Sequence, residues 1–458
     1  MVTILFLPGR MALTDPDEAR YAQASREMLR GGDLIVPRFN GEPRLSKPAL
    51  IHWLQAPPLA LLGDTETAAR LPSLMAASAL LLLTAWWAER RLGAGTGGPA
   101  AMALATCLVF FVCARLAITD MLLALFVTAA LMAWHEATSP DAAHPRALSW
   151  SGAAAIGVAA LAKGPVGPAL AGAIILLVSL AARFTRTAPR RHITARGTAL
   201  AAAAMGLLCG PWLAALAARI GPDQVLEVAR RETMERTLFG LDHPRPFYYF
   251  LAAFWLVFLP WSLALPFAMA RARRAASPPE PVTVLLCCWL GGTVLFFSLS
   301  ADKNDAWLLP AAPAVALLSA RWLPRRFTLI VSAAAGAMLI AAVLFASGSL
   351  SRERSLQELA LAMKPRPVAD ELLIGFKIYR PSLVFYADHT VRWVTSGKEL
   401  RGLLRDRDAD RPVTIVMESG RWDRLNDDTR GLLLARCRLT RPQVGYVALV
   451  PIAAGEGD

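Results

Sequence analysis

The sequence lacks the short motifs that identify many soluble enzyme classes. It has no GxxxxGK[ST] loop and no GxGxxG turn opening a helix, so a nucleotide-driven pump and a cytosolic nucleotide-sugar enzyme have no support. It also has no HExxH or comparable metal spacing. Its six cysteines show neither metal-site spacing nor a disulfide pattern, and the adjacent Cys287 and Cys288 fit small core residues.

Apolar residues are abundant instead. They make up 55% of the 458 residues, and the mean hydropathy is +0.43. Soluble domains reach roughly 45–50% even when glycine is counted. Apolar runs of about 20 residues are long enough to cross a bilayer, and the sequence predicts a mainly α, polytopic membrane protein. The expected spans are Leu71–Ala88, Pro99–Ala114, Met121–Trp134, Ser151–Ala162, Val166–Ala182, Thr198–Leu216, Phe247–Ala270, Val282–Leu299, Ala306–Ala320 and Phe327–Ser347.

The net charge of +13 comes largely from arginines in short loops between the apolar runs. Counting the spans puts four of these loops, at 90–91, 183–196, 271–274 and 321–326, on one side. That pattern indicates the cytoplasmic side of a membrane protein, and it argues against a nucleic-acid partner. The outer side then receives the polar segments 14–70, 115–120, 163–165, 217–246 and 302–305, together with the C-terminal region.

The two ends of the chain differ from the middle. Val2–Pro8 is apolar over only about a third of a span and has no signal-peptide features, so we expect that a late start has cut a first helix short. Residues 351–458 alternate strand-like runs with charged residues and predict a small soluble α/β domain. The expected division is a multi-span domain, 1–350, which includes an outer amphipathic loop at 14–70, and a soluble domain, 351–458. The expected strands are Leu372–Phe376, Val391–Thr395, Val413–Met417 and Val444–Pro451.

We expect the outer loop at 14–70, which is too polar to span a bilayer, to carry the active site. Its apolar positions from Tyr21 to Leu29 recur at helical spacing, and Gly31-Gly32 ends this helix. A turn at Asn40-Gly41 follows. Such a stretch lies along a membrane surface and holds charged side chains at the mouth of a cavity.

Three acids are candidate site residues. Asp17 and Glu18 either favour the dipole of a helix that begins there, or supply a general base for an acceptor hydroxyl. Asp120 ends the run that starts at Arg115, and ionisable groups at membrane depth face protein or a wet cavity. It forms either a structural pair with Arg115 or part of the site.

Four cations on the outer side, Lys47, Lys163, Arg245 and Lys303, are candidate phosphate ligands. The alternative for each is a side chain that reaches the membrane interface for its own solvation. His52 and His243, beside a tryptophan and among prolines, fit structural roles better than metal ligation.

Several motifs together resemble the family 39/83 membrane glycosyltransferases, especially the lipid A aminoarabinose transferases and, more distantly, the protein O-mannosyltransferases. The matching residues are Asp17-Glu18-Ala19-Arg20-Tyr21, Gly32-Asp33, Pro37, Asn40-Gly41, Lys47-Pro48, Trp53-Leu54, Ala69-Arg70-Leu71-Pro72, Arg115 with Asp120, Leu161-Ala162-Lys163-Gly164-Pro165, Pro246-Phe247-Tyr248-Tyr249, Pro260-Trp261-Ser262, Phe296-Phe297-Ser298, Ser300, Lys303, Tyr379-Arg380-Pro381-Ser382 and Phe385-Tyr386.

The resemblance implies a GT-C fold in a bacterial inner membrane and inverting transfer of a sugar from a polyprenyl-phosphate carrier at the outer face. The acceptor would be lipid A or another envelope lipid or glycan. By position, Asp17 and Asp120 match the family's acids, Arg20 is the companion of the first, and Lys47 is a phosphate-binding lysine. Lys163, Arg245 and Lys303 are further donor ligands, and Glu18, Tyr21 and His243 are additional site candidates.

The chain also departs from the aminoarabinose branch, because Ser46 and Ala49 stand where that branch commonly has Glu and Pro around the Lys-Pro pair. The sequence assigns no cofactor with certainty and leaves dependence on a divalent metal open. The alternative function is a lipid or sugar-lipid flippase, although flippases more often show paired repeats and broken helices near the midplane. A non-catalytic scaffold would leave the outer acids and cations without a role.

Overall fold

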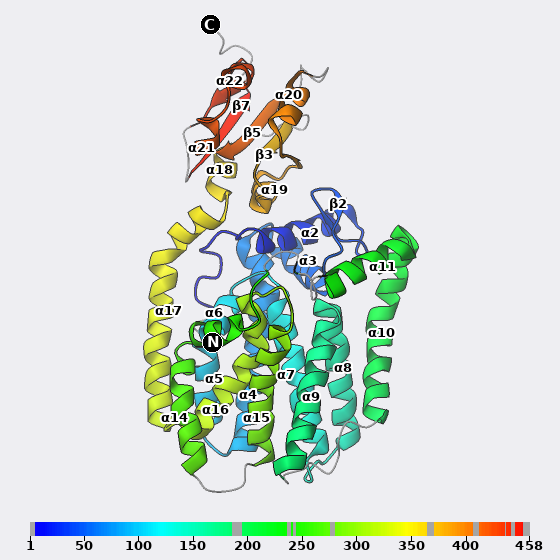
Figure 1. The fold of residues 1–458 in the computed structure, drawn as a ribbon, viewed down its shortest axis with the longest axis vertical. Helices are drawn as coiled ribbons and strands as arrows, with labels where there is room; N and C mark the ends of the chain where they lie inside the picture. Colours follow the sequence, from blue (N-terminus) through cyan, green and yellow to red (C-terminus); the bar gives the residue numbers. More distant parts are fainter. Residues whose placement is uncertain are drawn as a thin grey trace.

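The computed structural model describes residues 5–185, 195–235, 240, 244–274, 280–363, 371–405, 412–435, 437–440 and 445–451. A bundle of long helices carries two short helices, α2 and α3, across one end, and a small sheet domain stands beyond them (Figure 1). This arrangement confirms the predicted fold class.

Every predicted span coincides with a helix or a pair of helices. Within the described residues, six helices are long and apolar enough to cross a membrane, or eight if each of two bent pairs is one span. The helices of the bundle are α4 (Glu66–Leu92), α5 (Gly97–Ala105), α6 (Leu108–Ala114), α7 (Asp120–Thr138), α8 (Pro145–Lys163), α9 (Val166–Thr185), α10 (Ala195–Ile220), α13 (Tyr249–Val257), α14 (Trp261–Arg274), α15 (Pro281–Ser298), η2 (Asp305–Ala311), α16 (Ala312–Trp322) and α17 (Arg325–Arg354).

Two of the predicted spans are bent rather than straight. Helices α5 and α6 meet at 70°, and α13 and α14 meet at 98°. Proline removes a backbone donor and breaks a helix, which accounts for the second bend at Pro260. The two bends contact each other, because the backbone N–H of Leu108 donates to the carbonyl of Leu259 at 2.9 Å and the indole of Trp261 donates to Thr106 at 3.2 Å.

The opening segment folds as its sequence predicts. Helix α2 (Asp17–Gly31) ends at Gly32, whose φ of 67° lies in the left-handed region that glycine adopts without strain. A two-residue hairpin turn, Asn40-Gly41, joins β1 (Arg38–Phe39) to β2 (Glu42–Pro43) with φ values of 59° and 82°. Helix α3 (Leu50–Leu62) then leads to α4, while α11 (Pro222–Arg230) and the π-helical turn η1 (Arg231–Glu235) follow α10.

The C-terminal region is an α/β domain, as predicted. In the described residues its strands form one sheet in the order β4-β3-β5-β7-β6, parallel around β3 and antiparallel around β7. The elements are α18 (Gln357–Ala362), β3 (Leu372–Phe376), α19 (Pro381–Ala387), β4 (Val391–Val394), α20 (Gly397–Arg405), β5 (Val413–Glu418), α21 (Ser419–Trp422), α22 (Asp427–Leu434), β6 (Cys437–Leu439) and β7 (Tyr446–Pro451).

This domain is docked directly on the opening segment. Residues of α2, including Ala19 and Ala22, share a buried apolar cluster with Leu373 of β3 and Leu383 of α19. Asn40 exchanges hydrogen bonds with the backbone of Val391 at 2.7 and 2.8 Å. Further contacts across this interface are Leu13 to Tyr386, Asp15 to Ser382 and Arg30 to Asp388.

The described arginine-rich segments at 90–91, 271–274 and 321–326 lie at the opposite end of the bundle, where α4, α7 and α16 finish (Figure 1). Arg91 of α4 pairs with Glu136 of α7 at 2.5 Å, and Arg321 of α16 pairs with Glu280 at 2.6 Å. The bundle therefore has one arginine-rich end and one end that carries α2, α3 and the C-terminal domain.

Candidate functional site

Tyr21 lies at the centre of the candidate site. It is 5% exposed on α2, and the guanidinium carbon of Arg44 is 5.3 Å from its ring centre. Burial raises the pKa of the Tyr21 phenol, the negative charges of Asp17 and Asp120 raise it further, and Arg44 opposes them. The two acids therefore act electrostatically on one side chain, although they come from α2 and α7.

Asp120 begins α7 and pairs with Lys163 at the end of α8. Oδ1 of Asp120 accepts a hydrogen bond from Nζ of Lys163 at 2.5 Å, and both side chains are largely buried, at 12% and 10% exposed. The expected alternative partner, Arg115, donates instead to the carbonyls of Phe6 and Leu7. The structure thus joins a predicted acid to a predicted phosphate ligand.

Asp17 occupies the first turn of α2 and keeps half of its side chain exposed, at 51%. Its Oδ1 is 2.6 Å from Nη2 of Arg20, whose Nε donates to the carbonyl of Pro16. The carboxylate of Asp17 is therefore oriented by one cation and remains open to a ligand.

Glu18 has a different environment from its neighbour. It forms an ion pair with Arg70, and both side chains are 1% exposed. Its oxygens also accept hydrogen bonds from Ala117 and from Thr14. Because these contacts satisfy the carboxylate, Glu18 joins α2, α4 and the segment between α6 and α7 rather than facing a ligand.

Lys47 lies in the loop before α3 and reaches across to η1. Its Nζ donates to Oε2 of Glu232 at 3.0 Å and to the carbonyl of Ser46 at 2.9 Å. Each partner of the ion pair is 20% exposed. Ser46, which stands where the aminoarabinose branch commonly has Glu, contributes a backbone oxygen to Lys47. The carboxylate that pairs with Lys47 belongs to Glu232, in a distant segment of the chain.

Arg245 and Lys303 lie together at the end of the bundle that bears α2. Nζ of Lys303 donates to the backbone carbonyls of Arg245 and Ser300, which fixes the two loops against each other. Lys303 is 2% exposed, whereas the Arg245 side chain is exposed and lies over the ring of Tyr249 at 4.3 Å. His243 lies outside the described residues.

His52 belongs to a buried polar network. Its Nδ1 is 2.9 Å from the Ser25 hydroxyl, which donates to Gln55 at 2.6 Å. Burial lowers the pKa of the His52 imidazole to about 3, so the ring is neutral near pH 7. These contacts agree with the structural interpretation of this histidine.

Three contributors to this region were not identified from the sequence. Arg44 stands only three residues before Lys47 in a polar hairpin, and that local cluster of cations was the available signal. Asp15 and Glu232 gave no such signal, because their partners Ser382 and Lys47 lie far away in the chain.

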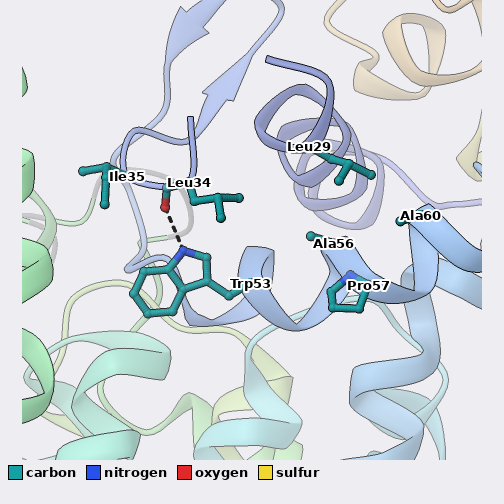
Figure 2. Close-up of a pocket in the computed structure, with 7 residues that line it drawn as sticks. All are labelled: Leu29, Leu34, Ile35, Trp53, Ala56, Pro57 and Ala60. Atoms are coloured by element: carbon teal, nitrogen blue, oxygen red, sulfur yellow. Dashed lines mark hydrogen bonds between the residues drawn. The ribbon is translucent and has the colours of Figure 1, made fainter. Parts of the chain in front are cut away.

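A groove of about 480 Å³ lies beside this site, between the end of α2 and the outward face of α3 (Figure 2). The indole N–H of Trp53 donates to the carbonyl of Leu34 across it at 2.7 Å. None of the described residues that line the groove is charged, which suits apolar contacts and not phosphate binding. The lining residues are Leu29, Leu34, Ile35, Trp53, Ala56, Pro57 and Ala60.

No group of three His, Cys, Asp or Glu side chains is arranged to hold a metal ion among the residues whose positions are described. The donors available near Tyr21 are the separate carboxylates of Asp17 and Asp120, each already paired with a cation.

Comparison with known proteins supports the resemblance. Residues 46–214 match the family model described as dolichyl-phosphate-mannose-protein mannosyltransferase. The chain is 33% identical over 323 residues to undecaprenyl phosphate-alpha-4-amino-4-deoxy-L-arabinose arabinosyl transferase 1 of Sodalis glossinidius, covering 69% of this chain and 56% of that protein. A transferase of the same name from Pectobacterium carotovorum is 31% identical over 332 residues, covering 70% and 57%.

Solved structures show the same fold. The crystal structure of ArnT from Cupriavidus metallidurans bound to undecaprenyl phosphate has a TM-score of 0.79 and 21% identity, and the match covers 100% of this chain and 97% of that one. Its apo form gives a TM-score of 0.78 over 99% of this chain and 96% of that one, also at 21% identity.

The matched region spans just over half the length of the curated transferases, 56% and 57% of those two proteins. Those relatives are bacterial, and the apolar helices agree with a polytopic protein of a bacterial inner membrane. The family model, the transferase relatives and the shared fold identify this chain as a GT-C protein that resembles the lipid A aminoarabinose transferases.

Proposed function

We propose that this protein is an inverting glycosyltransferase that takes a sugar from a polyprenyl-phosphate carrier at the outer face of the cytoplasmic membrane. The proposed acceptor is lipid A or another envelope glycan. The similar bacterial proteins are named as undecaprenyl phosphate-aminoarabinose arabinosyl transferases, and this chain shares their sequence over much of its length.

Two acid–cation pairs at the end of the bundle that bears α2 carry the proposal. Asp17 binds Arg20 at 2.6 Å, Asp120 binds Lys163 at 2.5 Å, and Arg44 lies 5.3 Å from the ring centre of Tyr21. An inverting displacement needs a base on one side of the sugar and stabilisation of a departing anion on the other. Acids and cations drawn together from α2, α7 and α8 suit that division of roles.

Asp17 is the proposed base. It takes the proton of an acceptor hydroxyl as the oxygen attacks the anomeric carbon, and the bond from that carbon to the carrier phosphate breaks with its electron pair on the phosphate. An acceptor phosphate, already ionised, would need no proton transfer. Asp120, held by Lys163, positions the sugar or the acceptor, since its carboxylate is bound by a buried cation.

The departing polyprenyl phosphate needs cations more than a proton donor. Lys47 and Arg245 are the proposed ligands of its phosphate, and Arg20 and Lys163 complete the positive field. Lys303 acts through the loop of Arg245, because it binds the backbone carbonyl of that residue. His243 and Glu18 stay secondary candidates, the first outside the described residues and the second engaged by Arg70.

The proposed orientation follows the arginine-rich end of the bundle. Loops rich in Lys and Arg remain cytoplasmic, so the end with Asp17, Asp120 and the C-terminal domain would face outward. The proposed domain division is 1–350 and 351–458, with the second domain docked on the outer segment 14–70.

Transfer by the purified protein from a radiolabelled polyprenyl-phosphate sugar tests the proposal. Wild-type protein should label an extracted envelope-lipid acceptor, and D17N should lose transfer while keeping its fold and membrane insertion. Comparing envelope lipids by mass spectrometry with and without the gene identifies the acceptor. Movement of labelled donor across liposomes without product would instead identify a flippase, and wild-type turnover in D17N would remove Asp17 from the mechanism.

A further inference from the structure

The loop between β3 and α19 brings an exposed tyrosine, paired with a partly buried tryptophan, to the edge of the candidate site. Tyr379 is 50% exposed, and its ring centre is 5.2 Å from that of Trp393 on β4, with the rings inclined by 58°. An aromatic side chain exposed this far at a polar site offers its face to a ligand. This pair belongs to the C-terminal domain, whose role the function proposed above leaves unassigned.

Neighbouring backbone positions hold both aromatic residues in place, Gly375 for Trp393 and Lys377 for Tyr379. A Cβ on Gly375 would meet Cε3 and Cζ3 of Trp393 at 2.5 Å, so the absence of a side chain at 375 lets the indole lie against β3. Lys377 has a φ of 51° in the left-handed region, and its N–H donates to the carbonyl of Val394 at 2.7 Å. A residue held in this strained conformation re-aims the chain before Tyr379.

The pair adjoins the proposed base. The guanidinium carbon of Arg20 is 6.0 Å from the ring centre of Tyr379, and the same guanidinium binds Asp17 at 2.6 Å. The loop is fixed relative to α2, because Ser382 donates to Asp15 at 2.6 Å from its backbone and at 2.5 Å from its hydroxyl. A group stacked on Tyr379 would therefore lie beside Asp17.

Two cations lie next to the pair. Lys377 is exposed on the same loop, and Arg20, which is bound to Asp17, lies over the ring of Tyr379. Arg380 is engaged by Tyr446, whose hydroxyl accepts from its Nε and Nη2 at 3.0 and 2.7 Å. Aromatic faces bind the apolar faces of sugar rings, and ammonium and guanidinium groups bind phosphate oxygens.

We propose that the C-terminal domain supplies an acceptor subsite, in which Tyr379, supported by Trp393, stacks on a sugar ring and Lys377 binds its phosphate. This inference rests on the proposed glycosyltransferase function, and it places contacts with the acceptor on the C-terminal domain. Tyr379 is a specificity-determining residue in this arrangement and takes no part in proton transfer.

Steady-state transfer tests the subsite, with donor and acceptor varied separately. Y379A should raise the acceptor KM about tenfold, the equivalent of one aromatic contact of about 1.4 kcal/mol, and leave the donor KM unchanged. Y379F keeps the ring and should stay within about twofold of wild type. W422A is the matched control, since Trp422 also lies by an arginine on this domain, at 5.4 Å, and belongs to no part of the subsite.

A binding measurement separates this inference from the proposed function. The probes are a phosphorylated glucosamine disaccharide and the same disaccharide without phosphate, added to donor-free full-length protein. We expect the phosphorylated probe to bind, Y379A to weaken both probes, and K377M to weaken only the phosphorylated one. Wild-type transfer with an unchanged acceptor KM in Y379A would overturn the subsite alone, whereas absence of any wild-type transfer would overturn the function on which it rests.

Discussion

Nζ of Lys163 lies 2.5 Å from Oδ1 of Asp120, and this ion pair joins the end of α8 to the start of α7. Both side chains are largely buried, so neither charge is fully solvated. Burying two charges costs free energy that their mutual attraction recovers only when both are present. Loss of either charge alone therefore destabilises the junction of the two helices, and the ion pair holds the carboxylate of Asp120 in place.

The first prediction separates the effect of this ion pair on stability from its effect on transfer. D120N should lower transfer by at least about 100-fold and also lower the midpoint of thermal unfolding, because it leaves a buried ammonium without its carboxylate. D120N/K163M should recover the thermal midpoint but not transfer. E136Q is the control, since Glu136 pairs with Arg91 at the other end of α7; it should lose stability and keep the specific activity of the folded protein. Recovery of transfer in the double variant would make the pair purely structural.

Loss of charge should have different effects at the two adjacent acids of α2: on transfer at Asp17 and on stability at Glu18. Asp17 is half exposed, so D17N should change the free energy of unfolding by less than about 1 kcal/mol while transfer is lost. Glu18 and Arg70 are buried together, so E18Q should cost about 3–5 kcal/mol. Denaturant unfolding and activity per folded molecule distinguish the two. Equal stability losses in both variants would contradict this assignment.

Local patterns in the sequence predict much of this fold. The apolar runs gave helices because a bilayer demands about 20 apolar residues whatever surrounds them, and Gly32, Asn40 and Gly41 have the backbone conformations that their residue types favour. The strand Leu372–Phe376 has the bounds that its apolar run predicts. Strand β6, Cys437–Leu439, was missed because three residues with a central arginine carry no period.

The site was less accessible to sequence reasoning. Counting spans places Asp17, Tyr21 and Asp120 at one end of the bundle, and the roles assigned to them there stay predictions. The partner of each charge depends on helix packing, so the pairing of Lys163 with Asp120 and of Lys47 with Glu232 could not be read from the chain. The docking of the C-terminal domain on α2 has the same cause, because its contacts join residues from opposite ends of the sequence.

The Lys47–Glu232 pair predicts competition with the donor. A phosphate and the Glu232 carboxylate are both anions, and they compete for Nζ of Lys47. E232Q should therefore lower the donor KM, whereas K47M should raise it by about tenfold or more. The acceptor KM should not change in either variant, which would show that both substitutions act on donor binding alone. A raised donor KM in E232Q would show that Glu232 orients Lys47 for the phosphate.

Docking of the C-terminal domain should depend on pH through Asp15. Burial raises the pKa of the Asp15 carboxyl to about 6, although the hydrogen bonds from Ser382 and the charges of Arg380 and Arg20 oppose this shift. Its ordinary value is 3.8, so between these values the folded protein binds more protons than the unfolded chain. The free energy of unfolding then falls as pH rises from about 4 to 6, and this contribution is constant at higher pH.

Hydrogen exchange of α19 and thermal unfolding of the full-length protein, both measured from pH 4.5 to 7.5, test this dependence. Wild type should lose protection of α19 as pH rises toward about 6, because ionising a buried carboxyl is unfavourable. D15N cannot ionise, and it should remove this part of the pH profile while keeping an amide that can pair with Ser382. D64N is the matched control, since Asp64 binds Arg30 in a more exposed position, and its profile should follow wild type. An unchanged profile in D15N would show that another group sets the pH dependence of docking.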